Sequence, residues 1–348
     1  MKAIHLDSLN KLVLSEVPDP PAPNGNELLL KVECVGVCGS DIHYFRTGRI
    51  GEQVVEFPFI LGHEFSATVL ETGTGVKNLK PGDRVAVDPA MPCFECEQCS
   101  QGRENTCLNL LFLGCPGQAE GAMKEKILMP EHCCYKIPDT MSLEEAVLVE
   151  PLSIGYYAVQ RAGNLQGKTV AVLGAGPIGD SVLLSARHFG AARIVVTDRI
   201  SERVKLASDL GADYVYNVEL CNASEEIKRV IPELTDIVFE CSGEQEAFDQ
   251  GIDILKPGGT LVLVGIPEFE RWSFRADQAR RKELNILHIR RQNGCVKPAI
   301  KLIASGKYDF GKMITHRFAP EQSQQAFEAV ANYSDGVLKA LLDIRMTN

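Results

Sequence analysis

The sequence predicts an α/β protein that combines a mostly β domain with a doubly wound domain built on six parallel strands. Up to residue 150, short β-type runs are separated by turns rich in Gly and Pro, which is typical of an irregular all-β fold. From residue 168 on, apolar β-type runs alternate with helical stretches, and this alternation indicates a parallel sheet covered by helices on both faces. A length of 348 residues also favours two domains, since single cores seldom grow beyond about 300 residues.

The mostly β domain is predicted from strands near the beginning of the chain and from the return of short strands at its end. Its first predicted strands are Glu27–Val37, Phe65–Glu71 and Asp83–Asp88, with turns such as Lys80-Pro-Gly-Asp83 between them. The last fifty-odd residues, which end in the β-type run Val337–Ile344, are too few for a separate domain. We therefore expect them to pack back onto the first domain.

The doubly wound domain is predicted from six strands that alternate with four helices. The strands are Lys168–Leu173, Ala192–Asp198, Asp213–Asn217, Asp236–Cys241, Thr260–Gly265 and Leu284–Ile289. The helices are Ile178–Phe189, Ser201–Leu210, Ser224–Ile231 and Glu246–Leu255. Ser201 is expected to be an N-cap, because serine hydroxyls accept hydrogen bonds from the free N–H groups of a first helical turn.

A glycine-rich turn follows the first of these strands, in Val170-Ala-Val-Leu-Gly174-Ala-Gly176-Pro177-Ile178-Gly179. Gly174 permits a tight turn, Gly176 lets the backbone approach a pyrophosphate, and Gly179 lets the helix pack against the strand. The free N–H groups of the helix N-terminus then face the phosphates. This context predicts a dinucleotide site, to which Pro177 and Ile178 also belong. The alternative is a glycine-rich turn in a sheet that binds something else.

Asp198 ends the next strand and predicts which dinucleotide is bound. A carboxylate there accepts hydrogen bonds from both ribose hydroxyls and disfavours a 2′-phosphate, so NAD is expected. The adjacent Arg199 keeps NADP open, and Arg203 is placed along the adenosine. Asp180, directly after the third glycine, stands where an apolar residue is usual. It would either favour the helix dipole or repel phosphate.

Charge and the absence of long apolar runs exclude several classes of partner. The formal net charge of −10 opposes binding to nucleic acid, whose phosphate backbone requires Lys and Arg in excess. The chain begins without an apolar run of the signal-peptide type and has no stretch of about 18 uninterrupted apolar residues. We therefore expect a cytoplasmic protein with reduced thiols and no membrane partner.

Four cysteines, Cys93, Cys96, Cys99 and Cys107, follow one another at spacings of three, three and eight. Four thiolates bind zinc tetrahedrally, and a short loop with Cys-x-x-Cys steps can wrap such an ion. Disulfides are the alternative, but they require an oxidising compartment. The loop predicts zinc and leaves open whether it belongs to a zinc-finger module or braces an enzyme. The acidic net charge weakens the zinc-finger interpretation.

A second group of metal-binding residue types lies ahead of this loop. Cys38 stands in Cys38-Gly-Ser-Asp-Ile-His-Tyr, and His63 and Glu64 follow Gly62. Cys, His and Glu are the ligand types of a catalytic zinc, which uses three protein ligands and keeps one position open. A lone Cys or His would be core or loop filler, whereas the three together predict a catalytic metal centre.

With these motifs the chain resembles a zinc-containing medium-chain alcohol dehydrogenase, and within that superfamily the sorbitol (polyol) dehydrogenase branch. The resemblance covers essentially the whole length. It rests on Gly36-Val-Cys38-Gly-Ser40-Asp-Ile-His43-Tyr44, Gly48-Arg-Ile-Gly51, Gly62-His63-Glu64, Lys80-Pro-Gly-Asp-Arg-Val85, the four-cysteine loop, Glu150-Pro-Leu, Gly174–Gly179 and Thr315-His-Arg-Phe318.

The resemblance implies a fold, an assembly and two zinc sites. It implies a GroES-like catalytic domain from residues 1–150 and 293–348, a Rossmann NAD domain from residues 151–292, and a homotetramer or homodimer. Cys38, His63 and Glu64 match the catalytic zinc ligands, and Cys93, Cys96, Cys99 and Cys107 match a closed structural zinc loop. Glu150 stands where simple alcohol dehydrogenases place a cysteine ligand. It either binds the catalytic zinc directly or holds a zinc-bound water.

The resemblance also implies the chemistry, which is oxidation of a secondary alcohol of a polyol to a ketose with hydride passed to NAD. Zinc would act as the Lewis acid that lowers the pKa of the alcohol. Ser40 and His43 are spaced for a proton relay, and Glu150 with a water is the alternative base. Tyr44 and Arg290 match positions that touch the polyol hydroxyls.

Two departures from the family pattern leave the substrate open. Ala67 replaces a frequent glycine, which is a small loss. Arg291 stands where the polyol branch often has an aromatic residue, and a second guanidinium would bind a carboxylate or phosphate bidentately. Alternatively it is solvated or faces the cofactor. Sorbitol, xylitol, iditol, a sugar acid, a polyol phosphate and a 1,2-diol therefore stay open. The nearest rival enzyme, a zinc-independent quinone reductase of the same superfamily, lacks the metal ligands.

Overall fold

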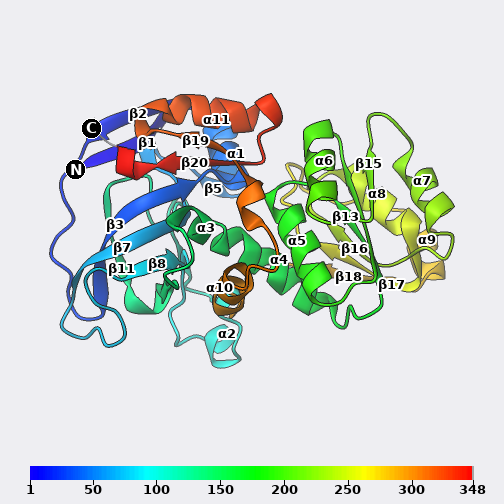
Figure 1. Ribbon diagram of the computed structural model, residues 1–348, viewed down its shortest axis with the longest axis horizontal. Helices are drawn as coiled ribbons and strands as arrows, with labels where there is room; N and C mark the ends of the chain where they lie inside the picture. The colour runs from blue at the N-terminus through cyan, green and yellow to red at the C-terminus, as the bar shows by residue number, and fades with distance from the viewer. Residues whose placement is uncertain (347–348) are drawn as a thin grey trace. The chain divides into compact units, whose positions relative to one another are not determined.

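The computed structural model describes residues 1–346, which form two units. The first unit contains Met1–Glu150 together with the residues from Val296 onward, and the second contains Pro151–Cys295. Figure 1 draws the first strand (blue) and the last strand (red) in the first unit. Among the described residues, no helix is both long and apolar enough to cross a bilayer.

A seven-stranded sheet forms the centre of the first unit. Its strands are β3 (Glu27–Gly36), β7 (Glu64–Thr72), β8 (Arg84–Val87), β11 (Lys126–Pro130), β12 (Cys134–Lys136), β19 (Ile314–Phe318) and β20 (Lys339–Asp343). The order is β12-β8-β7-β3-β20-β19, and β11 also pairs with β3. The three strands expected in the first 90 residues are confirmed as β3, β7 and β8 to within one residue at each end. β20 runs antiparallel to β3, so the end of the chain completes a sheet begun near residue 27.

Smaller elements cover this sheet. A three-stranded sheet combines β1 (Lys2–Ser8), β2 (Lys11–Glu16) and β6 (Phe59–Ile60), and two hairpins are formed by β4 (Arg49–Ile50) with β5 (Gln53–Val54) and by β9 (Ala90–Met91) with β10 (Leu111–Phe112). The helices are α1 (Gly39–Thr47), α2 (Glu97–Ser100), α3 (Leu143–Val147), α10 (Val296–Ala304) and α11 (Ser323–Ala331). Phe45 of α1 packs on Phe327 of α11 with ring centroids 5.3 Å apart, which joins the two chain ends in one core.

The second unit contains the predicted six-stranded parallel sheet, in the order β15-β14-β13-β16-β17-β18. The strands are β13 (Thr169–Leu173), β14 (Arg193–Asp198), β15 (Tyr214–Asn217), β16 (Thr235–Glu240), β17 (Leu255–Leu263) and β18 (Asn285–His288). The helices are α5 (Pro177–His188), α6 (Ser201–Asp209), α7 (Ala223–Val230), α8 (Gln245–Ile254) and α9 (Ala276–Arg281), and α4 (Val149–Ala162) begins at the end of the first unit. Every residue of β13 is buried, as expected of a central parallel strand covered on both faces.

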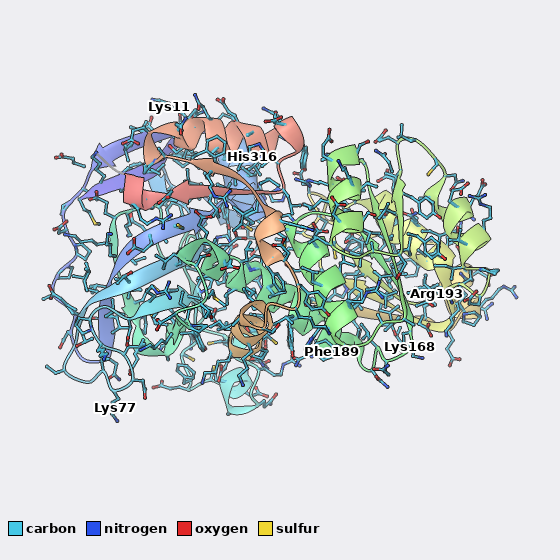
Figure 2. All side chains as sticks on the ribbon, in the orientation of Figure 1. Lys11, Lys77, Lys168, Phe189, Arg193 and His316 are labelled. Atoms are coloured by element: carbon cyan, nitrogen blue, oxygen red, sulfur yellow. The ribbon has the colours of Figure 1, made fainter. Side chains whose placement is uncertain are left out.

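Two ends of this sheet differ in chemistry. Lys168 and Arg193, labelled in Figure 2, stand at the amino ends of β13 and β14, where they pair with Asp236 and Glu233. Asp198 and the glycine-rich turn lie at the carboxyl ends of the same strands. Ligands of open α/β sheets bind at the carboxyl ends, so this is the edge where a dinucleotide is expected.

The prediction that Ser201 is an N-cap was wrong. Ile200 is the N-cap, and Ser201 is the first residue of α6. The Ser201 hydroxyl instead accepts a hydrogen bond from Asn217 Nδ2 at 2.8 Å, and the Ile200 N–H donates to Asp198 Oδ1 at 2.8 Å. Asn217 of β15 therefore binds the hydroxyl group that we expected to cap the N-terminus of α6. The helix α9 was also missed, and β17 begins five residues earlier than expected.

Candidate metal centres and dinucleotide site

The first candidate centre starts at the turn between β3 and α1. Cys38 is the N-cap of α1, and its N–H donates to Asp41 Oδ2 at 3.0 Å. The other carboxylate oxygen of Asp41 accepts from the Gly62 N–H at 3.3 Å and lies 3.5 Å from His63 Nδ1. Asp41 is completely buried and therefore ties together the two segments that carry the ligand-type residues. An acid in the first turn also complements the helix dipole.

Cys38, His63 and Glu64 form a cluster in which one ligand atom of each residue lies within 4.8 Å of those of the others. His63 and Glu64 are buried and Cys38 is half-buried. Burial opposes protonation of His63, but Asp41 and Cys38 outweigh it and raise the pKa of His63 well above its usual value. A thiolate, an imidazole and a carboxylate at this mutual distance fit the donor set of a catalytic zinc, and the imidazole–carboxylate contact is a common support of metal-binding histidines.

Gly62 makes the turn into these ligands possible. Its φ of +93° is in the region that favours glycine, and a Cβ there would lie 2.8 Å from Met123 Cγ. The ring of His63 also contacts Phe112, with centroids 5.4 Å apart. The two residues after Gly62 are therefore held by backbone geometry and by packing before any metal binds.

Glu150 is buried in the first turn of α4, near this cluster but outside the set of atoms within 4.8 Å of one another. Burial raises the pKa of Glu150 to about 8, Glu64 and Asp88 add to the shift, and His63 and Lys339 oppose it. A carboxyl group with this pKa can accept a proton near neutral pH. The two predicted roles of Glu150, direct binding of the metal and binding through a water, both stay predictions.

Helix α1 brings the other predicted residues of the first unit to the same segment. Ser40 and His43 are half-buried and lie one turn apart on α1. Tyr44 is buried, and its hydroxyl donates to Gln53 Oε1 at 3.3 Å and lies 3.7 Å from Cys115 Sγ. The proton relay and the contact of Tyr44 with substrate stay predictions.

The four-cysteine loop brings its thiols together around α2. The Sγ–Sγ distances are 3.4 Å for Cys93–Cys107, 3.6 Å for Cys96–Cys99 and 3.8 Å for Cys96–Cys107. These separations are far longer than a disulfide bond, and all four cysteines are free. The N–H groups of Leu108 and Cys99 lower the pKa of the Cys96 thiol to about 6. Burial raises the pKa of the neighbouring Cys99 thiol to about 12, so the metal-free loop does not ionise uniformly. The close approach of the four sulfurs is what fits a closed structural zinc site.

The glycine-rich turn of the second unit has the geometry that a dinucleotide requires. Gly174 has φ +101°, and a Cβ there would lie 2.9 Å from Ser242 N. A Cβ on Gly179 would lie 1.8 Å from Gly174 O, so only glycine permits this approach. Gly176 is the N-cap of α5 and Pro177 its first residue, which leaves the next N–H groups free to face phosphates.

Asp198 and Arg203 frame this turn. Asp198 Oδ2 accepts the Ala175 N–H at 2.7 Å, so the carboxylate is held against the turn. Arg203 is buried, and its Nη1 lies 3.8 Å from the place where a Cβ of Gly176 would stand. Asp180 is fully buried, and burial raises its pKa well above the usual value, with Asp198 adding to the shift and Arg203 opposing it. Both effects considered for Asp180, attraction to the helix dipole and repulsion of phosphate, require the carboxylate and are weakened, because burial favours the neutral acid.

Arg290 and Arg291 follow β18 in the second unit. Arg290 is exposed, and Arg291 is half-buried with φ +54°, an uncommon conformation for a residue other than glycine. Neither residue belongs to the unit that carries the cluster of Cys38, His63 and Glu64. The contact of Arg290 with substrate stays a prediction.

Sequence reasoning missed two residues of the first centre, Asp41 and Lys339. Lys339 is fully buried in β20, and its Nζ donates to Glu64 Oε2 at 2.5 Å and to Val37 O at 3.2 Å. The signal was present in the sequence, since a lysine inside the apolar run Val337–Leu342 is costly unless it is paired. Asp41 is visible in the sequence between Ser40 and His43, but its contact with His63 is seen only in the folded structure.

Comparison with known proteins assigns the chain to a family. Residues 24–139 match the alcohol dehydrogenase GroES-like domain, and residues 177–305 match the zinc-binding dehydrogenase family. The chain is 36% identical over 343 residues to the sorbitol dehydrogenase of Bacillus subtilis (strain 168), covering 98% of this chain and 97% of that protein. It is 40% identical over 311 residues to the sorbitol dehydrogenase of Bos taurus, covering 88% and 87%.

The chain belongs to the zinc-containing medium-chain alcohol dehydrogenase family. Within it, the chain lies in the sorbitol (polyol) dehydrogenase branch. The expected GroES-like and Rossmann folds are therefore confirmed, as are zinc and a nicotinamide dinucleotide as the cofactors of this dehydrogenase. The zinc-finger and quinone-reductase interpretations are set aside, because the whole chain matches zinc-containing dehydrogenases.

Solved structures agree with this dehydrogenase over nearly its whole length. The oxidoreductase ECK1772 of Escherichia coli, of unknown specificity, has a TM-score of 0.93 at 31% identity and covers 98% of each chain. A zinc-binding dehydrogenase of Sinorhizobium meliloti 1021 bound to NADP has a TM-score of 0.90 at 30% identity over 98% of each chain. Galactitol-1-phosphate dehydrogenase of Escherichia coli has a TM-score of 0.90 at 26% identity, covering 99% of this chain and 100% of that one.

Proposed function

We propose that this dehydrogenase oxidises a secondary alcohol of a polyol, such as sorbitol, xylitol or iditol, to a ketose, with NAD as the hydride acceptor. The observation that carries the proposal is the cluster of half-buried Cys38 with buried His63 and Glu64, in a chain that matches sorbitol dehydrogenases over most of its length. The donor set is that of a catalytic metal with a position left for substrate.

The residues of the first unit take distinct roles in this proposal. Cys38, His63 and Glu64 hold zinc, which when bound supplies the Lewis acid that lowers the pKa of the substrate hydroxyl. Ser40 and His43 carry the released proton outward along α1. Glu150 with a water is the alternative proton acceptor, because its carboxyl group is buried near the cluster.

The second unit holds the dinucleotide in this proposal. Gly174, Gly176 and Gly179 admit the pyrophosphate to the N-terminus of α5, and Asp198 accepts the ribose hydroxyls. When bound, NAD supplies the acceptor for the hydride. The four cysteines of the loop around α2 have no open position for substrate, so their zinc is structural.

The experiment that tests this function is a substrate panel followed by NADH absorbance, with polyols, 1,2-diols, aldonates and polyol phosphates as separate arms. We expect the highest kcat/KM with a polyol of four to six carbons, and loss of turnover after chelation with recovery on addition of zinc. A zinc-replete enzyme that turns over no secondary alcohol of the panel would overturn the proposal.

A sugar acid or a polyol phosphate is the second candidate for the substrate. Arg291 next to Arg290 offers two guanidinium groups, and guanidinium binds carboxylate and phosphate bidentately. A related solved structure is a galactitol-1-phosphate dehydrogenase. Higher kcat/KM with the aldonate or phosphate arm, lost in Arg291→Ala, would favour this candidate over the neutral polyol.

We expect Asp198→Ala to relax the preference for NAD over NADP by about 10- to 100-fold. The variant loses charge-assisted hydrogen bonds worth about 1.5–3 kcal/mol and no longer repels a 2′-phosphate. The measurement is the ratio of kcat/KM for NAD and NADP, together with fluorescence titration by NADH and NADPH.

Asp213→Ala is the matched control for Asp198→Ala. Asp213 also accepts a backbone N–H, that of Ile194 at 2.7 Å, but it lies at the other end of β14. Its removal tests whether loss of a brace to the sheet changes cofactor choice. An unchanged cofactor ratio in Asp198→Ala would count against the ribose role.

A further inference from the structure

A buried lysine occupies the metal-bearing edge of the first unit. Lys339 and Glu64 are each 1% exposed, and the Lys339 Nζ lies 2.5 Å from Glu64 Oε2. Replacing such a buried pair by apolar side chains is often neutral or stabilising, so the pair is weak evidence for a role in stability. Its position points elsewhere, because Glu64 shares the cluster with Cys38 and His63.

The two oxygens of Glu64 have different surroundings. Oε2 accepts from Lys339 Nζ on one side and packs against Gly36 on the other, where an added Cβ would lie only 2.4 Å from it. Strand pairing keeps this arrangement, because Gly36 of β3 is opposite Glu64 of β7 and opposite Leu341 of β20. Oε2 of Glu64 is therefore held by Lys339 and by packing against Gly36 before a metal binds.

The position of Lys339 is fixed as firmly as that of Glu64. Its Nζ also donates to Val37 O at 3.2 Å, and the Val37 N–H donates to Ala340 O at 3.0 Å, so the lysine is anchored to the strand that leads to Cys38. Cys38 and Glu150 are the other acidic groups that act on the ammonium. A single cation thus faces three potential anions of the cluster region.

We propose that Lys339 is a positioning residue that occupies Glu64 Oε2 and leaves only Oε1 to a metal held with Cys38 and His63. The inference rests on the proposed metal centre and deepens it. A carboxylate that offers one oxygen leaves the centre with three protein donors and an open position for a substrate hydroxyl. Without the lysine, Oε2 keeps only its packing against Gly36, and Glu64 can turn to offer the metal a second oxygen that takes the open position.

The test is Lys339→Met in protein loaded with cadmium-113 at both metal sites. The cadmium chemical shift depends on the number of thiolate donors, so the one-thiolate site and the four-thiolate site give separate resonances. We expect Lys339→Met to displace or abolish the one-thiolate resonance and to leave the four-thiolate resonance unchanged. In the zinc enzyme we expect turnover to fall about 10- to 100-fold, the usual cost of losing a partner that orients a metal ligand.

Three controls distinguish the possible causes. Lys339→Arg keeps a cation and should restore most of the wild-type shift. Lys282→Met removes another lysine with backbone acceptors, those of Ile252, Asp253 and Leu255 in the second unit, and should move neither resonance. Cys38→Ser should abolish the one-thiolate resonance, and its persistence there would contradict the proposed metal centre itself.

An unshifted one-thiolate resonance in Lys339→Met, with Cys38→Ser behaving as expected, would overturn the role of Lys339 alone. Lys339→Gln provides a second variant, because its amide keeps a polar donor in the buried site but is shorter than lysine and uncharged, so it does not replace the ammonium. If both variants lose both resonances and unfold, the lysine supports the fold rather than the carboxylate, and the inference fails.

Discussion

Replacement of Cys38 by serine is expected to abolish turnover and to remove one zinc per chain while leaving the second zinc in place. A serine hydroxyl stays protonated near neutral pH and does not replace the thiolate beside His63 and Glu64. Loss of a Lewis acid worth several kcal/mol lowers kcat/KM by about 1000-fold or more. The measurements are zinc content by atomic absorption and initial rates followed by NADH absorbance.

Cys221→Ser is the matched control for this substitution. Cys221 is a free, half-buried cysteine of the second unit whose Sγ lies 3.4 Å from Asn217 O, outside both clusters. It should keep two zinc ions and near wild-type activity. If Cys38→Ser loses one zinc and keeps its activity, the cluster does not hold the catalytic zinc.

Cys96→Ser is expected to remove the other zinc and to lower the melting temperature, on the order of 10 °C. Cys96 accepts the Leu108 N–H at 3.4 Å, and its Sγ lies within 3.8 Å of those of Cys99 and Cys107, so its removal takes one of the four sulfurs from the group. Loss of a structural metal is among the few single changes that cost more than about 4 kcal/mol. Thermal unfolding by circular dichroism and zinc analysis measure the effect.

The two cysteine variants should separate stability from chemistry. Protein that survives Cys96→Ser should keep wild-type turnover per remaining zinc, because the four cysteines and the cluster of Cys38, His63 and Glu64 are separate sets of ligands. An unchanged melting curve after loss of the loop zinc would contradict a structural role. If Cys96→Ser loses turnover but keeps its melting temperature, the reaction takes place at the loop zinc instead.

Features that depend on local sequence were predicted well. The strands β13, β14 and β16 begin and end within one or two residues of the expected positions, because an apolar strand between turn residues is defined by its own composition. The glycines of the dinucleotide turn were predictable for the same reason. Gly174 has a positive φ that other residue types rarely adopt, and at Gly179 a side chain would collide with Gly174 O.

Several contacts between distant partners were not predicted. The Ser201 cap failed because Asn217 takes the serine hydroxyl across α6 and β15. Lys339 and Glu64 are 275 residues apart in sequence, and only the pairing of β20 with β3 brings the ammonium to the carboxylate. Asp41 was visible in its motif, but its contacts with Gly62 and His63 arise from the turn into β7.

The sequence by itself determined the family, the types of metal ligand and the dinucleotide motif. Each of these depends on a few residue types at short, fixed spacings, and few other residue types could serve there. The tertiary structure decided how those groups are held. It placed Cys38, His63 and Glu64 within 4.8 Å of one another, and it buried Glu150 so that the pKa of its carboxyl group is raised to about 8. It also committed one oxygen of Glu64 to Lys339. Burial and long-range pairing set these properties, since both depend on which strands meet rather than on which residues are adjacent in the chain.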